Sequence, residues 1–190
     1  VFLRIGLLAI GGAYSFFPED PLSLNDLAKQ KKVTALVDAG VAPGVDNLIL
    51  GYYNARMKIE SFECVVGGLP KNPKPPYFYK APFSPIDVIE EYTRPARFIK
   101  NGKLVVKPAL TDVQEMSFPK AGKLVSVNTD GLRTLLTTMK HVPNMIEKTL
   151  RYSEHIKIIT TLHEGGYFDK KEIAIKSCNI SPLTFTSKLL

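Results

Sequence analysis

The sequence predicts an α/β protein of the α+β kind. We expect the tail of a parallel sheet, followed by a domain with a mixed or antiparallel sheet and helices packed on one face. Before about residue 58, a helical pattern, a short aliphatic run and a second helical pattern follow one another, which is the alternation of an α/β sheet. After that point, short strand patterns are separated by prolines and by an Asn-Gly turn, which is typical of hairpins.

The chain opens with an apolar stretch, residues 1–12, that is too short to span a bilayer. It also lacks the small-residue cleavage pattern of a signal peptide. We therefore expect a buried strand or helix that begins upstream, and a chain that forms the interior of a longer protein.

A helix is expected to begin at Ser23, because Asp26 follows three residues later in the pattern of a capping box. Its buried face would contain Leu24, Leu27 and Ala28. Residues 33–38, "VTALVD", are a compact β-branched and aliphatic run that predicts a strand buried on both faces.

Residues 43–57 predict a second helix, and the chain between 58 and 190 predicts a separate set of elements. One side of this helix would carry Val45, Leu48, Ile49, Tyr52 and Tyr53. The later elements are a strand at 59–70, a proline-rich segment at 71–83, a short helix at 84–93, a hairpin at 94–110 that turns at Asn101-Gly102, a strand at 122–131, a helix at 131–143 and a helix at 153–166 capped by Ser153 and ended by Gly165.

The composition is that of an ordinary globular protein, with 45% hydrophobic residues and a net charge of +7. The basic residues are scattered and form no stripe interleaved with aromatics, so we expect a solvated surface and no nucleic-acid partner. Cys64 and Cys178 lie far apart and form no disulfide framework, which favours a reducing cytoplasm.

The stretch "DAGVAPG", residues 38–44, lies between the predicted strand and the helix that follows. Ligands of open α/β sheets bind at this place, where glycines permit close approach and a helix start offers N–H groups to an anion. A tight turn without a ligand is the alternative, and the sequence leaves both open.

The polar segment "NTDGLRT" follows a predicted strand and offers groups that suit an amino-acid substrate. Arg133 would bind a carboxylate in a bidentate fork and Asp130 an ammonium group, with Asn128 and Thr129 beside them. A helix cap formed by Thr129 or Asp130 is the alternative.

Further candidates are weaker when taken singly. Tyr79 and Lys80 follow the prolines, and Lys80 is a possible proton-transfer group. "EKTLRYSEH" would be a salt-bridged helix face. His155 and His163 lack a third ligand with metal spacing, so we expect no metal site. The chain contains no G-x-G-x-x-G, so the phosphate cradle of a dinucleotide would have to come from residues outside it.

Eight collinear segments together resemble the saccharopine dehydrogenase superfamily, in particular its lysine 6-dehydrogenase branch. They are "SFFPEDPLSLNDLAK", "VDAGVAPGVDN", "VGGLPKNPKPPYFYK", "EYTRPARFIKNGK", "NTDGLRTL", "EKTLRY" with the later His, "LHEGGYFD" and "ISPLTFTSKLL". The resemblance covers nearly the whole chain beyond about residue 13.

The resemblance implies an oxidoreductase that uses NAD or NADP and acts on a C–N bond of an amino acid. Residues 1–57 would be the C-terminal part of a Rossmann-like cofactor domain with its junction helix. Residues 58–190 would be the substrate-binding and dimerisation domain, truncated at its C-terminus, in a homodimer without a membrane partner. The catalytic group would be Lys80 or Asp130, with Tyr79, Asn128, Thr129 and Arg133 on the substrate, and the cofactor would meet Asp38, Gly40, Val41, Pro43 and Gly44.

Departures from the family pattern affect what can be carried over. "IGGAYSF" stands where the family usually has an apolar strand that includes an aspartate, so that contact with the cofactor or substrate is not carried over. "RYSEH" stands where the family usually has "RYPGH", and this difference weakens any role for Arg151 and His155. Ile86 stands where saccharopine-cleaving members have an arginine, which favours a smaller substrate such as lysine. Saccharopine or carboxynorspermidine dehydrogenase activity, or a non-catalytic dimerisation module, are the competing hypotheses.

Overall fold

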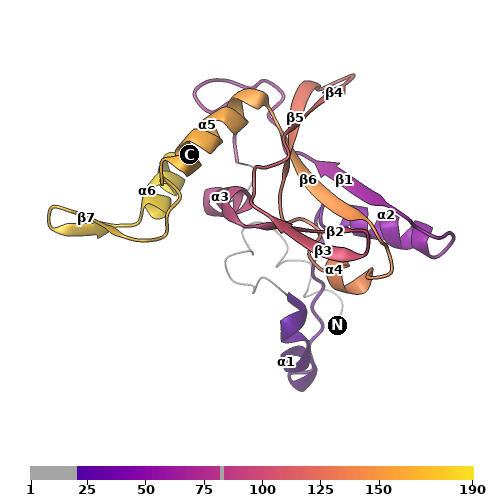
Figure 1. The fold of residues 1–190 in the computed structure, drawn as a ribbon. Coiled ribbons are helices and arrows are strands. Elements are labelled where there is room, and N and C mark those ends of the chain that lie inside the picture. Colours follow the sequence, from indigo (N-terminus) through magenta and orange to yellow (C-terminus); the bar gives the residue numbers. More distant parts are fainter. Residues whose placement is uncertain (1–20, 82–83) are drawn as a thin grey trace. The chain divides into compact units, whose positions relative to one another are not determined.

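The computed structural model describes residues 21–81 and 84–190 and consists of antiparallel strand pairs and helices (Figure 1). The helical elements are the 3₁₀ turn η3 (Pro21–Leu24), α1 (Asn25–Gln30), α2 (Val45–Asn54), α3 (Pro85–Thr93), α4 (Leu135–Thr138), α5 (Ser153–Glu164) and α6 (Pro182–Leu189). The strands are β1 (Phe62–Val66), β2 (Ala96–Lys100), β3 (Lys103–Lys107), β4 (Gln114–Phe118), β5 (Gly122–Asn128), β6 (Met145–Arg151), β7 (Ile173–Ile175) and β8 (Cys178–Ile180).

Six strands form one sheet in the order β3-β2-β6-β5-β4, and β1 also pairs with β6. The pairs β2/β6, β4/β5 and β5/β6 are antiparallel, with Ile99 opposite Met145 and Val127 opposite Thr149. Strands β7 and β8 form a separate antiparallel ribbon. This architecture confirms the predicted mixed class, with an antiparallel sheet and helices. Among the described residues, no helix combines the length and the apolar character that a membrane crossing requires.

The chain divides into two compact units, which are described separately below. The first unit comprises the described residues up to Cys64, together with Arg97–Val106 and Asp130–Glu147. The second unit comprises the described part of Val65–Ala96, together with Lys107–Thr129 and Lys148–Leu190. The predicted domain boundary near residue 57 stays a prediction.

The first unit contains the predicted hairpin turn and has its own apolar core. Asn101 and Gly102 have φ of 52° and 73°, as a two-residue turn of the I′ type requires. The turn is fastened by the N–H of Gly102, which donates to the Pro143 carbonyl at 2.8 Å. The buried core consists of Leu50, Phe98, Leu132, Leu135, Val142 and Met145.

The second unit has a core built mainly from helices α3, α5 and α6. Tyr92 and Ile159 are at most 1% exposed within it. Helix α5 also packs on β5 through Ile156, which contacts Val125 and Val127. The complete buried set of the main core is Val88, Ile89, Tyr92, Ile159, Phe168 and Leu183.

The predicted strand at residues 33–38 is wrong, because these residues are irregular and none of them is buried. Leu36 has 73% and Val33 59% of its surface exposed. A strand needs neighbours that satisfy its backbone N–H and C=O groups, and no described strand pairs with this segment. Four aliphatic residues in six therefore do not make a strand by themselves.

Two helix caps and two helix faces were also predicted wrongly. Ser23 lies in the 3₁₀ turn, the residue before α1 is Leu24, and α1 has no buried residue. Ser153 is the first residue of α5, preceded by Tyr152, and its hydroxyl bonds to Glu154. The predicted inner face of α2 is exposed, and its buried residues are Asp46 and Leu50.

Several elements went unrecognised in the sequence. Strand β6 contains "EKTLR", which had been interpreted as a helix face. Strands β4, β7 and β8 and helix α6 carried no prediction. The predicted element at 1–12 and the "SFFPED" segment lie wholly or mostly outside the described residues.

Candidate functional site

The loop from Asp38 to Gly44 closes on itself immediately before α2. The N–H of Gly40 donates to the Pro43 carbonyl at 3.0 Å, and the N–H of Val45 donates to the Gly40 carbonyl at 3.0 Å. Gly44 has φ of 152°, and a Cβ atom there would overlap the backbone of Gly40. A glycine is therefore required at position 44 by the turn itself, whether or not a ligand is bound.

The first N–H groups of α2 are not offered to an anion, contrary to the expectation from sequence. The N–H of Gly44 donates to Asp46 Oδ1 at 2.7 Å, and the N–H of Asp46 donates to the Val41 carbonyl at 3.2 Å. The N–H of Val45 is also used within the loop. These internal acceptors are mostly backbone carbonyls, so no side-chain pattern in the sequence could have revealed them.

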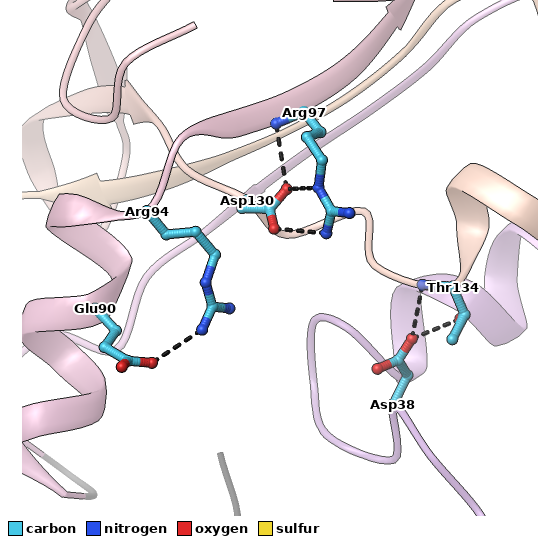
Figure 2. A network of polar contacts seen from close by, with 6 residues as sticks. All are labelled: Asp38, Glu90, Arg94, Arg97, Asp130 and Thr134. Atoms are coloured by element: carbon cyan, nitrogen blue, oxygen red, sulfur yellow. Dashed lines mark hydrogen bonds and ion pairs between the residues drawn. The ribbon is translucent and has the colours of Figure 1, made fainter. Parts of the chain in front are cut away.

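Asp38 connects this loop to the segment that was predicted to bind substrate, within the first unit. It adopts φ of 51°, a conformation that Asp tolerates better than most residues. Its Oδ2 accepts hydrogen bonds from the Thr134 N–H at 3.1 Å and from the Thr134 hydroxyl at 2.5 Å, as Figure 2 shows. The predicted cofactor stretch thus contacts the residue that follows Arg133.

Asp130 lies in the same unit and is bound by an arginine that the sequence analysis did not single out. Arg97 Nε donates to Oδ1 at 2.9 Å and Nη2 donates to Oδ2 at 2.7 Å, in a bidentate pair (Figure 2). The backbone N–H of Arg97 adds a third bond at 3.2 Å. Both carboxylate oxygens are therefore engaged, which leaves the role of Asp130 towards a substrate as a prediction only.

Arg133 is the remaining predicted site residue of the first unit. It is 8% exposed and has φ of 46°, which is unusual for a residue with a long side chain. The local chain conformation between Asp130 and Thr134 is thus fixed by the Asp38 and Arg97 contacts at its two ends. In the first unit the structure brings together Asp38, Gly40, Val41, Pro43, Gly44, Asp130 and Arg133.

The other four predicted residues belong to the second unit. The Asn128 side chain donates to Thr111 Oγ1 at 3.0 Å and to Asp112 Oδ2 at 2.8 Å. The Thr129 hydroxyl bonds to that of Thr149 at 2.9 Å. Lys80 is exposed, and Tyr79 is half-buried with no hydrogen-bond partner for its hydroxyl among the described residues.

The second unit also contains a buried polar chain around Arg151 and His155. Arg151 Nε donates to the Tyr92 hydroxyl oxygen at 2.8 Å, and Arg151 Nη2 donates to Glu91 at 2.8 Å. Because the Tyr92 oxygen accepts from Arg151, its own proton is available for His155 Nε2 at 2.9 Å. His155 Nδ1 then carries the ring proton and donates to the Tyr77 carbonyl at 2.8 Å.

This chain of bonds requires a neutral imidazole, and the environment of His155 favours one. Burial, together with the nearby charge of Arg151, lowers its pKa to about 4, although the hydrogen bond to Tyr77 acts in the opposite direction. The ring also lies 4.6 Å from that of Tyr79, over which the Arg151 guanidinium is placed at 4.7 Å. The proline-rich segment before Lys80 is thereby fastened to β6 and α5.

The second unit has two further polar contacts near these residues in the sequence. The Tyr152 hydroxyl donates to the Pro70 carbonyl at 3.0 Å and fixes the start of the proline-rich segment. Arg94 pairs with Glu90 at 2.9 Å across one turn of α3 (Figure 2). Among the described residues, therefore, Arg151 and His155 lie on a strand and a helix and have structural partners, not a shared helix face.

Comparison with known proteins gives a consistent family assignment. The family model described as "Saccharopine dehydrogenase C-terminal domain" matches residues 40–190. The alpha-aminoadipic semialdehyde synthase of Arabidopsis thaliana is 26% identical, over 83% of this chain and 16% of that protein. The chain therefore spans about one sixth of the length of this curated relative.

A solved structure shares the fold. It is the apo histidine-tagged saccharopine dehydrogenase (L-Glu forming) from Saccharomyces cerevisiae, with a TM-score of 0.50 and 23% identity. The match covers 68% of this chain and 32% of that one.

Proposed function

Because this chain belongs to the saccharopine dehydrogenase C-terminal domain family, we propose that it forms the substrate-side part of an amino-acid oxidoreductase. The enzyme would use NAD or NADP and oxidise a C–N bond. Within the family, the resemblance of the motifs favours lysine 6-dehydrogenase activity. The subunits would form a homodimer, and the substrate would be a small amino acid.

The observation that carries this proposal is the contact between Asp38 and Thr134. It connects the stretch that resembles the family's cofactor contact with the stretch that resembles its substrate contact, inside one compact unit. A second observation supports it from the other unit. The Tyr79 hydroxyl is buried and has no hydrogen-bond partner among the described residues, so a polar substrate group would supply the partner that it lacks.

The described residues do not fit the pyrophosphate of a dinucleotide. The sequence has no G-x-G-x-x-G, and the Gly44, Val45 and Asp46 N–H groups are used internally. In this proposal the dinucleotide would accept a hydride, and its phosphates would be bound outside these 190 residues.

Saccharopine is the competing substrate, and the name of the similar yeast protein, a saccharopine dehydrogenase, favours it. The argument for lysine depended on Ile86, which packs against the second core among α3, α5 and α6. Ile86 therefore has a packing role that is independent of the substrate.

The test is an assay of NAD and NADP reduction with lysine and with saccharopine, using the protein encoded together with the sequence that precedes Val1 in the gene. We expect reduction with lysine and little with saccharopine. The reverse preference would establish the competing substrate. Failure of both substrates, with no G-x-G-x-x-G in the preceding sequence, would support a non-catalytic dimerisation module.

The 190-residue chain alone is expected to reduce neither dinucleotide with either substrate, because it lacks a phosphate cradle. Robust lysine-dependent reduction by this chain would contradict that part of the proposal.

A further inference from the structure

Three side chains of metal-ligand type converge in the first unit, and none of them takes part in the contacts already described for Asp130 and Thr134. Asp46 comes from α2, Cys64 from β1 and Glu147 from β6. One ligand atom of each, the thiol sulfur and a carboxylate oxygen from each acid, lies within 4.8 Å of the other two. Since the residues are 18 and 83 positions apart, no spacing rule applied to the sequence would find them.

Asp46 provides evidence for a ligand that is independent of this convergence. Its side chain belongs to a residue that is only 8% exposed, although α2 is otherwise largely exposed. Oδ1 accepts the Gly44 N–H at 2.7 Å, whereas Oδ2 is buried and has no hydrogen bond of normal geometry. The Cys64 thiol interacts with the Asp46 carboxylate, but a thiol is a weak donor. A buried carboxylate oxygen without a good partner is costly.

Glu147 places a second carboxylate at the same point. It is 4% exposed, and its carboxylate lies so close to Gly131 that a Cβ atom there would overlap it. Two carboxylates near one another in a buried site repel each other and destabilise the ionised state. The two carboxylates also affect the thiol. Burial is the largest cause, and the charges of Glu147 and Asp46 add to it, so that the pKa of Cys64 is raised to about 12.

A divalent cation would give the buried Asp46 oxygen a partner and would offset the repulsion between the two carboxylates. We propose that Asp46, Cys64 and Glu147 form a binding site for a zinc-class divalent cation. A thiolate with two carboxylates suits Zn²⁺, whose catalytic and open sites use three protein ligands and water, and it disfavours Mg²⁺ and Ca²⁺, which prefer oxygen alone. Binding replaces the Cys64 thiol proton, so that one sulfur–metal bond forms and one proton is released to solvent.

Entry and support are also present in the described structure. Cys64 is half-buried, whereas Asp46 and Glu147 are buried, so the cysteine is the most exposed of the three residues. Asp46 Oδ1 accepts a hydrogen bond from the Gly44 N–H, as outer contacts commonly orient metal ligands. The cation would thus fix the carboxylate that fastens the Asp38–Gly44 loop.

Cobalt titration of the 190-residue chain tests this site directly. Co²⁺ takes zinc sites and gives a strong near-ultraviolet charge-transfer band only when a thiolate is bound. We expect this band to saturate at one equivalent and to disappear when Zn²⁺ is added. Absence of the band in the wild-type chain would overturn the proposal.

Matched cysteine variants identify which thiol is responsible. C64S should abolish the band, whereas C178S, which changes the exposed cysteine, should leave it unchanged. D46N and E147Q should each weaken cobalt binding at least tenfold. Loss of the band in C178S, with retention in C64S, would show that only adventitious binding occurs.

A measurement on the wild-type chain keeps the proposal testable if a variant fails to fold. Zinc should slow the alkylation of Cys64 by N-ethylmaleimide at least tenfold while leaving Cys178 reactive, as read by peptide mass spectrometry. Equal rates for Cys64 with and without zinc would refute the site. Neither readout depends on dehydrogenase activity, so the outcome is separate from that of the proposed function.

Discussion

At the scale of single residues, the polar chain from Arg151 to His155 shows how a charged group is kept stable in a core. Arg151 is bound by Tyr92, by Glu91 and by the Leu150 carbonyl. Because each of the three guanidinium nitrogens donates to an acceptor and Glu91 supplies a negative charge, burial does not leave an unpaired charge. The direction of these bonds fixes which nitrogen of His155 carries its proton.

The stability of the protein should fall as the pH decreases from about 6.5 to about 4 because of His155. Its folded pKa is lowered to about 4 by burial, whereas the unfolded value is near 6.5. In this window the unfolded chain binds the proton and the folded chain does not, which costs up to about 3 kcal/mol. Urea unfolding at several pH values would measure the loss.

His155→Gln should remove this part of the pH dependence, since glutamine does not titrate. His141→Gln is the matched control, because His141 is exposed and bonds only to Asn54 among the described residues. An unchanged pH profile in the His155 variant would contradict the prediction.

Asp38→Ala should destabilise the first unit by about 1–3 kcal/mol, because the Thr134 N–H and hydroxyl lose their acceptor. Alanine is also disfavoured at φ of 51°. Asp38→Asn retains an acceptor and tolerates this conformation, so it should cost less. Guanidinium unfolding of the three proteins would show the difference. Equal losses would mean that the carboxamide cannot replace the carboxylate.

At the scale of elements, helix α2 shows the limits of a hydrophobic pattern. Its extent was predicted well, from 43–57 in the sequence to Val45–Asn54 in the structure. Its orientation was not, because Leu48, Ile49 and Tyr52 are more than half exposed while Asp46 is buried. A pattern of apolar residues identifies a helix by its period. It does not show which side is buried, and in α2 packing buries the side that carries Asp46 and Leu50.

Leu50→Ala should therefore cost about 2–5 kcal/mol, since this side chain is 3% exposed and belongs to the first core. Leu48→Ala, two residues away on the same helix and 74% exposed, should change the stability by less than about 0.5 kcal/mol. Chemical unfolding measures both. A larger loss for Leu48 would show that the exposed side of α2 is packed in solution.

The same reasoning explains which elements the sequence could predict. The hairpin β2/β3 was found because Asn101-Gly102 determines its turn locally. The strand β6 was missed because "EKTLR" has a buried Glu, Lys and Arg, and their burial depends on partners far along the chain, such as Glu91 for Arg151. The Asp38–Thr134 and Arg97–Asp130 pairs were missed for the same reason, since no local signal encodes a contact over 96 or 33 residues.

At the scale of the whole molecule, the chain has two separate apolar cores, one in each compact unit. Both cores draw on segments that are distant in sequence. The first combines α2 with β2, α4 and β6, and the second combines α3 with α5 and α6. The expected boundary near residue 57 was based on a change of sequence pattern, which does not report such long-range packing.

Each core should be sensitive to truncation. Leu132→Ala in the first unit and Ile159→Ala in the second should each cost about 2–5 kcal/mol, because both side chains are at most 1% exposed. Val106→Ala, at 57% exposed, is the control and should cost little. Differential scanning calorimetry would measure the three. A small effect for either core residue would mean that its cavity collapses on mutation.

The ribbon β7/β8 should make the protein sensitive to proteases at this place in the chain. Residues 170–179 are all exposed, and a two-stranded ribbon that buries no apolar side chain is only marginally stable. Its backbone should open readily into the extended form that a protease cleft accepts. Limited trypsin digestion should therefore cut first after Lys170, Lys171 or Lys176, leaving a large fragment that ends within this ribbon.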